Sequence, residues 1–174
     1  MVDNMILDII SVINERFVTK GTIIENQQCI CNHLYFIKSG CLRGFHYHNG
    51  KEITAWFGFE NDFATSTYSF VSRKPAIEII EAIEDSSILE ISYSDLQNIY
   101  KKYPEFNIIG RLLTEKYYIG LMERTLHLQY NSAKENYELL IENHPHIIKR
   151  ISLGYIASYL GISQETLSRI RAKK

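Results

Sequence analysis

The 174-residue chain has no apolar run approaching the roughly 20 residues that a membrane-spanning helix requires. Its first residues also lack the basic and apolar segments of a signal peptide. We therefore expect a cytoplasmic protein with no membrane partner, whose three cysteines are reduced thiols.

Signals of catalysis are also missing. The sequence has no phosphate-binding glycine loop, no nucleophile elbow and no zinc-binding helix with paired histidines. Cys29, Cys31 and Cys41 have spacings that fit neither iron–sulfur nor zinc ligation. We therefore predict that the chain is not an enzyme and holds no resident cofactor.

Two histidines offer an alternative. His46 and His48 are two residues apart in a β-rich run, so both imidazoles would lie on one strand face and could bind a metal ion. With Gly40 before them and Glu52 and Gly58 after them, they nearly resemble the first metal motif of cupins. The last spacing is one residue short and no second motif follows, so we predict no metal site. A cupin-like metal enzyme or small-molecule binder remains the alternative function.

The net charge of the chain is small, but the charges are unevenly distributed. The composition, 45% hydrophobic and 22% charged, is that of a soluble globular protein. The net charge is −1, yet residues 149–174 hold six basic residues and one acidic residue, a balance of +5, which leaves −6 for residues 1–148. A basic tail on an acidic body is typical of a small module that contacts phosphates.

The first 91 residues are mainly β-rich. Apolar residues at helical spacing predict a short helix over residues 4–17, and short strands follow it. Asn49-Gly50 lies between two of these runs and is the strongest hairpin signal in the chain. The regular spacing predicts a β-barrel or roll. The predicted strands cover residues 22–24, 34–37, 41–48, 52–59, 77–82 and 87–91.

Helical periodicity returns after residue 92. Ser94-Asp95 can cap a short helix that continues to Tyr100, and a long helix is predicted over residues 106–130. Leu112, Ile119 and Leu126 recur every seven residues on the long helix. This stripe predicts a parallel partner helix from a second copy, although burial of the helix within its own domain is the alternative.

A second domain is predicted to begin after residue 130. Ser132-Ala-Lys-Glu135 is a capping box, which starts a new helix that continues to about Asn143. The division therefore gives an effector-type domain with its dimerisation helix (residues 1–130) and a terminal domain (residues 131–174).

Residues 153–172 have the pattern of a helix-turn-helix. Ile156 and Leu160 form one buried stripe, and Leu167 and Ile170 form another. Between the stripes, Gly161 can adopt the left-handed conformation of a tight turn, Ile162 fills the corner and Ser163 caps the second helix. A small residue at Ala157 lets the helices approach each other.

The order of these elements resembles the cyclic-AMP receptor and fumarate–nitrate regulator (CRP/FNR) family of bacterial transcription factors. The resemblance is carried by residues 34–40, 50–52, 61–63 and, most specifically, by residues 156–170. It implies an α+β fold: a cyclic-nucleotide-binding-like β-roll (jelly roll), a long dimerisation helix over about residues 106–130 and a terminal helix-turn-helix. The implied partners are double-stranded DNA, a second copy of the chain and RNA polymerase. A cyclic-nucleotide-domain interaction module is a third alternative.

The resemblance also implies roles on the recognition helix. Bases would be read by Gln164, Glu165, Ser168 and Arg169, because an arginine fork fits guanine O6 and N7 and a carboxylate accepts from the cytosine amino group. Phosphates would be contacted by Ser163, Thr166, Lys149, Lys173 and Lys174. An intrahelical ion pair between Glu165 and Arg169 is the alternative role for both.

The sequence departs from the family in two places. The family holds cyclic nucleotides with a Gly-Glu pair and a later arginine, where this chain has Thr65, Ser66 and Ala76, followed by Ile77. Without a cation for the phosphate, we expect that cyclic AMP is not the effector. Arg73 and Lys74 are near in sequence, but Pro75 suggests an exposed loop. The chain also ends at Lys174, so the wing that follows the recognition helix in the family is incomplete.

Overall fold

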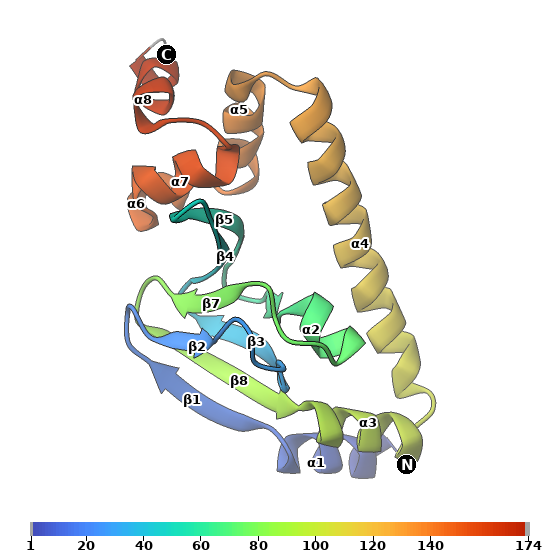
Figure 1. Ribbon diagram of the computed structural model, residues 1–174. Coiled ribbons are helices and arrows are strands. Elements are labelled where there is room, and N and C mark those ends of the chain that lie inside the picture. Colours follow the sequence, from blue (N-terminus) through green and yellow to red (C-terminus); the bar gives the residue numbers. More distant parts are fainter. Residues whose placement is uncertain (1, 173–174) are drawn as a thin grey trace. The chain divides into compact units, whose positions relative to one another are not determined.

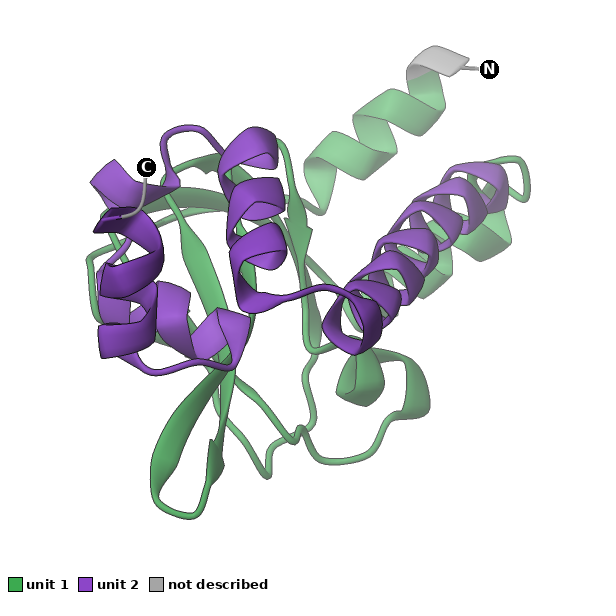
Figure 2. Cartoon of the chain, turned by 90° about the horizontal axis from the view of Figure 1, so that it is seen from above, with its two compact units in different colours: residues 1–106 green, residues 107–174 purple. Residues whose placement is uncertain are grey.

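The computed structural model describes residues 2–172. The chain forms two compact units, Met1–Phe106 and Asn107–Lys174, which Figure 2 distinguishes by colour. The predicted boundary after residue 130 lies at the junction of two helices in the second unit. The long helix therefore groups with the terminal helices rather than with the β-rich unit. Over residues 2–172, no helix combines the length and apolarity needed to cross a bilayer.

The first unit is a roll of two four-stranded antiparallel sheets (Figure 1). The strand orders are β1-β8-β3-β6 and β2-β7-β4-β5. The predicted β-roll is therefore confirmed. The strands are β1 (Asn14–Val18), β2 (Ile23–Glu25), β3 (His33–Ser39), β4 (Leu42–His48), β5 (Lys51–Gly58), β6 (Phe63–Ala64), β7 (Ile79–Ala82) and β8 (Ser86–Ser92).

Alternating side chains of both sheets form the core of the roll, because successive strand residues point to opposite faces. Trp56 packs against this core from β5 and lies opposite Gly44 of β4. A Cβ at Gly44 would lie 2.1 Å from the Trp56 ring, so the indole requires glycine there. The core residues are Val18, Tyr35, Ile37, Leu42, Ala64, Ile80, Ala82 and Ile88.

The predicted hairpin is present between β4 and β5. Asn49 and Gly50 have φ values of +50° and +74°, and His48 pairs with Lys51 across the turn. Positive φ at both central residues is the requirement of a type I′ turn, which explains why Asn-Gly occurs here.

The helix predicted over residues 4–17 is wrong at its C-terminal end. Helix α1 (Val2–Ser11) stops at Ser11, and the remaining residues form β1, which pairs with β8. Val18 is buried while Phe17 is 67% exposed, as expected for a strand at the side of a roll. Pairing with a segment about 70 residues away overrode the local helical spacing.

Three short elements were not predicted from the sequence: β6, α2 (Thr67–Ser72) and α6 (Ile147–Arg150). Each is too short to show a recognisable period. Helix α3 (Tyr93–Lys102) was predicted, but its N-cap is Ser92, whose hydroxyl accepts a hydrogen bond from the Asp95 amide, rather than Ser94.

The second unit is helical. Helix α4 (Phe106–Tyr130) has the predicted bounds and contains no buried residue. Helix α5 (Ala133–Asn143) begins with the predicted capping box of Ser132 and Glu135. The chain continues through α6 into α7 (Leu153–Leu160) and α8 (Gln164–Ala172).

Candidate nucleic-acid interface and the interior of the roll

Helices α7 and α8 form the predicted helix-turn-helix. Gly161 adopts φ +69° at the end of α7, and the amide of Ile162 donates to the Ala157 carbonyl at 3.0 Å. These are features of a Schellman turn, which satisfies the last carbonyls of the helix. Ile156 and Leu167 are completely buried, so the stripes predicted from the sequence are the inner faces of the two helices.

Side-chain caps fix where both helices begin. Ser152 accepts a hydrogen bond from the Tyr155 amide at 3.3 Å, and Ser163 accepts one from the Thr166 amide at 3.2 Å. Ser163 is therefore the N-cap that was predicted for the second helix. Its hydroxyl is partly committed to the helix, because it already accepts from the Thr166 amide.

The structure exposes all four candidate base-reading side chains. Gln164, Glu165, Ser168 and Arg169 lie on α8 and are accessible to solvent, whereas Leu167 is buried between them. Their exposure on the N-terminal half of α8 is what base readout in a major groove requires.

The local interactions of Glu165 and Arg169 differ from the intrahelical ion pair that was the alternative to base readout. The Glu165 pKa is lowered, first by its own backbone amide, then by the Ser163 hydroxyl, with a smaller contribution from the charge of Arg169. The Arg169 guanidinium instead reaches the Glu165 carbonyl and the Thr166 hydroxyl, both at 3.4 Å. Within residues 2–172 no ion pair joins the Glu165 carboxylate to Arg169.

The candidate phosphate contacts are more scattered. Ser163 is exposed and Thr166 half-buried at the start of α8, while Lys149 is exposed on α6, which precedes α7 (Figure 1). Lys173 and Lys174 lie outside the described residues. The structure thus brings Ser163 and Thr166 beside the base-reading candidates, whereas Lys149 belongs to a different helix.

The residues expected at the effector pocket lie around helix α2. Ala76 and Ser66 are buried, and Thr65 donates to the His33 carbonyl at 2.9 Å and lies 3.3 Å from the Cys31 sulfur. Ala76 exchanges backbone hydrogen bonds of 2.8 Å with its neighbours Gln28 and Cys29. Ile77, by contrast, is 66% exposed.

A carboxylate lies in this part of the roll. Glu78 precedes the core residue Ile80 by two positions and accepts a hydrogen bond of 2.9 Å from the Trp56 indole. Burial raises the pKa of Glu78, against the lowering effects of the Trp56 and Ser66 donors and of nearby His46. Burial therefore disfavours negative charge here.

The neighbouring arginine points elsewhere. Arg73 is half-buried, not in the exposed loop that Pro75 suggested, and its guanidinium donates to the carbonyls of Cys31 and Phe70 and to the Asn32 side chain. It also stacks over the Tyr93 ring at 3.9 Å. These contacts hold the cation against the α2–α3 region.

The cysteines and histidines show no metal cluster. Cys31 and Cys41 are buried thiols and Cys29 is an exposed one. Burial raises the pKa of Cys31, which is the usual state of a structural thiol. Among residues 2–172, no three His, Cys, Asp or Glu side chains are placed to hold a metal ion. The Nε2 atom of His48 instead lies 3.3 Å from the side-chain amide nitrogen of Asn49.

The comparison with known families gives a match within the first unit. Residues 15–103 match the family model described as the cyclic nucleotide-binding domain. The chain belongs to this family. None of the curated proteins compared with it matches the chain.

Solved structures extend the likeness to nearly the whole chain. FixK2 from Bradyrhizobium japonicum is 19% identical, with a TM-score of 0.79 over 93% of this chain and 84% of its own. The c-di-GMP-responsive regulator CLP from Xanthomonas campestris is 16% identical, with a TM-score of 0.76 over 98% and 90%. A protein described as a CRP/FNR-family transcriptional regulator, from Eubacterium rectale, is 26% identical, with a TM-score of 0.75 over 96% and 80%. The predicted resemblance and fold are thus confirmed.

Glu78 and Trp56 were missed by the sequence reasoning. A period of two from the buried Ile80 back to Glu78, directly before β7, would have predicted that the carboxylate faces the interior of the roll. Nothing local to Trp56 reveals its partner, because the indole and the carboxylate are 22 positions apart.

Replacing Glu78 with glutamine should stabilise the protein at neutral pH. The raised pKa means that the folded state binds the Glu78 proton more tightly than the unfolded state, so this group's contribution is favourable at low pH. That contribution is lost as the pH rises from the ordinary carboxyl value of about 4.3 through the raised folded value.

Urea unfolding of wild type and Glu78→Gln between pH 4 and pH 8 measures the effect. The stability difference in favour of Glu78→Gln should be near zero at pH 4 and grow towards pH 8. Glu142→Gln, on an exposed part of α5, is the control and should show no such trend. A pH-independent difference for Glu78→Gln would contradict the expected role of burial.

Proposed function

We propose that the protein is a DNA-binding transcription regulator that binds a roughly palindromic operator as a homodimer. The observation that carries the proposal is the exposed polar row of α8, held on a helix-turn-helix whose turn, cap and inner faces are complete. The likeness to regulators of the CRP/FNR type supports the same function. RNA polymerase is the further partner expected of such a regulator.

Arg169 is the side chain proposed to contribute most to base readout. Its guanidinium is exposed and makes only long contacts of 3.4 Å with its own helix, so it can turn towards a guanine at little cost. Glu165 and Gln164, one turn earlier on α8, would read neighbouring bases, with Ser168 beside them.

Replacing Arg169 with alanine should weaken binding to the operator by roughly 5- to 150-fold, the equivalent of one lost bidentate base contact. The probe is a duplex that wild type selects from a random pool, and binding is measured by mobility shift over a range of salt concentrations. Arg16→Ala, which removes a half-buried arginine of the roll that pairs with Glu90, is the charge-matched control and should bind like wild type.

The salt series and the unrelated duplexes distinguish contacts to bases from contacts to phosphates. Affinity should fall as salt rises, because phosphate contacts release counterions. Failure of wild type to bind any duplex at about 50 mM salt would reject the proposed function. Equal losses for Arg169→Ala on selected and unrelated duplexes would reject base readout by Arg169.

The dimer is proposed from the surface of α4. Ile108, Leu112, Ile119, Met122 and Leu126 form a seam along this helix and are 44–57% exposed. A parallel copy of the helix would cover such a seam with knobs-into-holes packing. Two recognition helices could then enter successive major grooves about 34 Å apart.

A charge in the seam should separate the copies. Ile119→Asp is expected to raise the dimer dissociation constant by about 100-fold or more, since an unpaired carboxylate would be buried in the interface. Thr114→Asp, on the opposite side of α4, is the matched control and should remain dimeric. Sedimentation equilibrium gives both constants, and an unchanged Ile119→Asp dimer would exclude this seam.

We further propose that cyclic AMP is not the effector. The family's phosphate-binding cation is replaced by Ala76, while Arg73 is held by carbonyls, Asn32 and Tyr93. Glu78, directly before β7, would repel a phosphate when ionised. A ribose hydroxyl would meet Ser66 in place of a carboxylate.

Calorimetric titration tests this directly. Wild type should give no binding heat with cyclic AMP up to about 1 mM, at pH 7 and without DNA. Glu78→Gln should behave in the same way, because removing the repulsion does not supply the missing cation. Micromolar binding to wild type would contradict the proposal.

A further inference from the structure

Helix α4 and the terminal helices are joined by a link that the proposed function does not use. The Arg124 guanidinium of α4 donates a hydrogen bond of 3.0 Å to the backbone carbonyl of Tyr159 and lies 3.7 Å from the centre of the Tyr159 ring. The two residues are 35 positions apart and belong to the same compact unit. The contact therefore connects the proposed dimer helix to the first helix of the helix-turn-helix.

The interactions of the Arg124 guanidinium with Tyr159 favour one orientation of α4 relative to α7. Tyr159 is the penultimate residue of α7, so its carbonyl is one of the last four, which lack the usual intrahelical partner. The cation meets the negative end of the α7 dipole while its plane stacks on an aromatic ring. The guanidinium is thus held by two different interactions, a hydrogen bond and a contact with a ring face.

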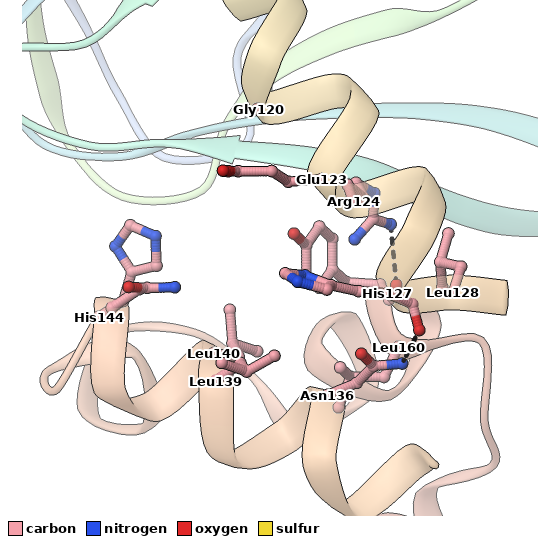
Figure 3. Close-up of a pocket in the computed structure, with 12 residues that line it drawn as sticks. Gly120, Glu123, Arg124, His127, Leu128, Asn136, Leu139, Leu140, His144 and Leu160 are labelled. Atoms are coloured by element: carbon pink, nitrogen blue, oxygen red, sulfur yellow. Dashed lines mark hydrogen bonds between the residues drawn. The ribbon is translucent and has the colours of Figure 1, made fainter. Parts of the chain in front are cut away.

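Close packing does not fix this orientation, because a cleft of about 300 Å³ lies between α4, α5 and α7. Gly120, Glu123, His127 and Leu128 line it from α4, and Leu139 and His144 from the α5 side (Figure 3). A helix that borders a cleft can change its angle at less steric cost than a helix packed on all sides in a filled core. Directional contacts at the edges of the cleft therefore carry more of the positioning.

A second contact lies near the chain junction. The Asn136 side chain donates to the His127 carbonyl at 3.3 Å, and Asn131 donates to the Asn136 side chain at the same distance. These bonds fix where α4 ends and α5 begins, only a few residues apart in sequence. Arg124 lies one turn earlier on α4 than His127 and is bonded to α7 instead of α5 (Figure 3).

We propose that Arg124 is a positioning residue that sets the angle between α4 and the recognition helix, and thereby the operator half-site spacing that the dimer accepts. This inference rests on the proposed function. Arg124 lies on the side of α4 away from the Leu112–Ile119–Leu126 seam, so it is available to α7 while the seam is covered by a second copy. It contacts neither the proposed operator nor the partner helix.

The test compares spacing preference with affinity for one half-site. The probes are the duplex selected by wild type, the same duplex with two base pairs inserted at its centre, and a single half-site. Two base pairs turn one half-site by about 70° relative to the other. Wild type should therefore lose about tenfold or more in affinity for the expanded site.

Arg124→Ala should reduce that discrimination to about threefold or less while half-site affinity stays at the wild-type value. Tyr159→Leu should have the same effect, and the double variant should be no worse than either single variant, since both remove one interaction. Arg124→Lys, which keeps the charge without the planar fork, should be intermediate. Lys116→Ala removes another cation near a tyrosine of α4, at 5.8 Å, and should discriminate like wild type.

The outcomes separate this inference from the proposed function. Absence of any binding by wild type removes the proposed function and this inference with it. Wild-type spacing discrimination in both Arg124→Ala and Arg124→Lys would overturn the positioning role alone. A parallel loss of half-site and full-site affinity would also overturn it, because Arg124 would then support the fold of the terminal helices rather than their angle.

Discussion

The packing of α8 against α7 is the constraint on which the candidate DNA-reading surface depends. Leu167 and Ile156 are completely buried in the corner between the two helices, and Gly161 makes that corner possible with a positive φ. Because Leu167 is held inward, Glu165 and Arg169, two residues away on either side of it, must face outward on the far side of α8. The direction of these two proposed base contacts thus follows from one buried side chain and one turn.

In the roll, packing likewise determines where the polar side chains point. Its architecture is that of the cyclic nucleotide-binding domain family, and side chains from both of its sheets form the core. Trp56 fills space over Gly44 and bonds Glu78, and Arg73 is held by backbone carbonyls. A conserved arrangement of strands does not require the family's ligand chemistry, because the strands are stabilised by core packing rather than by the ligand.

Much of the fold followed from the sequence where the signal was local and periodic. The bounds of α4, the capping box at Ser132 and the Asn49-Gly50 turn were predicted because each depends on residues within one or two turns of each other. Residues 14–17 were misassigned to a helix because their partner strand is about 70 residues away. The cap of α3 was placed two residues late for a smaller reason: Ser92 and Ser94 are both capable caps.

The sequence by itself determined the helix-turn-helix, the polar face of its second helix and the absence of a cation at position 76, since each depends on residue type and short spacing. Tertiary structure decided what surrounds these positions. It directed the Arg73 guanidinium to Cys31 and Tyr93, brought Trp56 to Glu78 and joined Arg124 to Tyr159. Those contacts connect residues 20 to 42 positions apart, and such pairs are selected by how strands and helices pack, which no local pattern encodes.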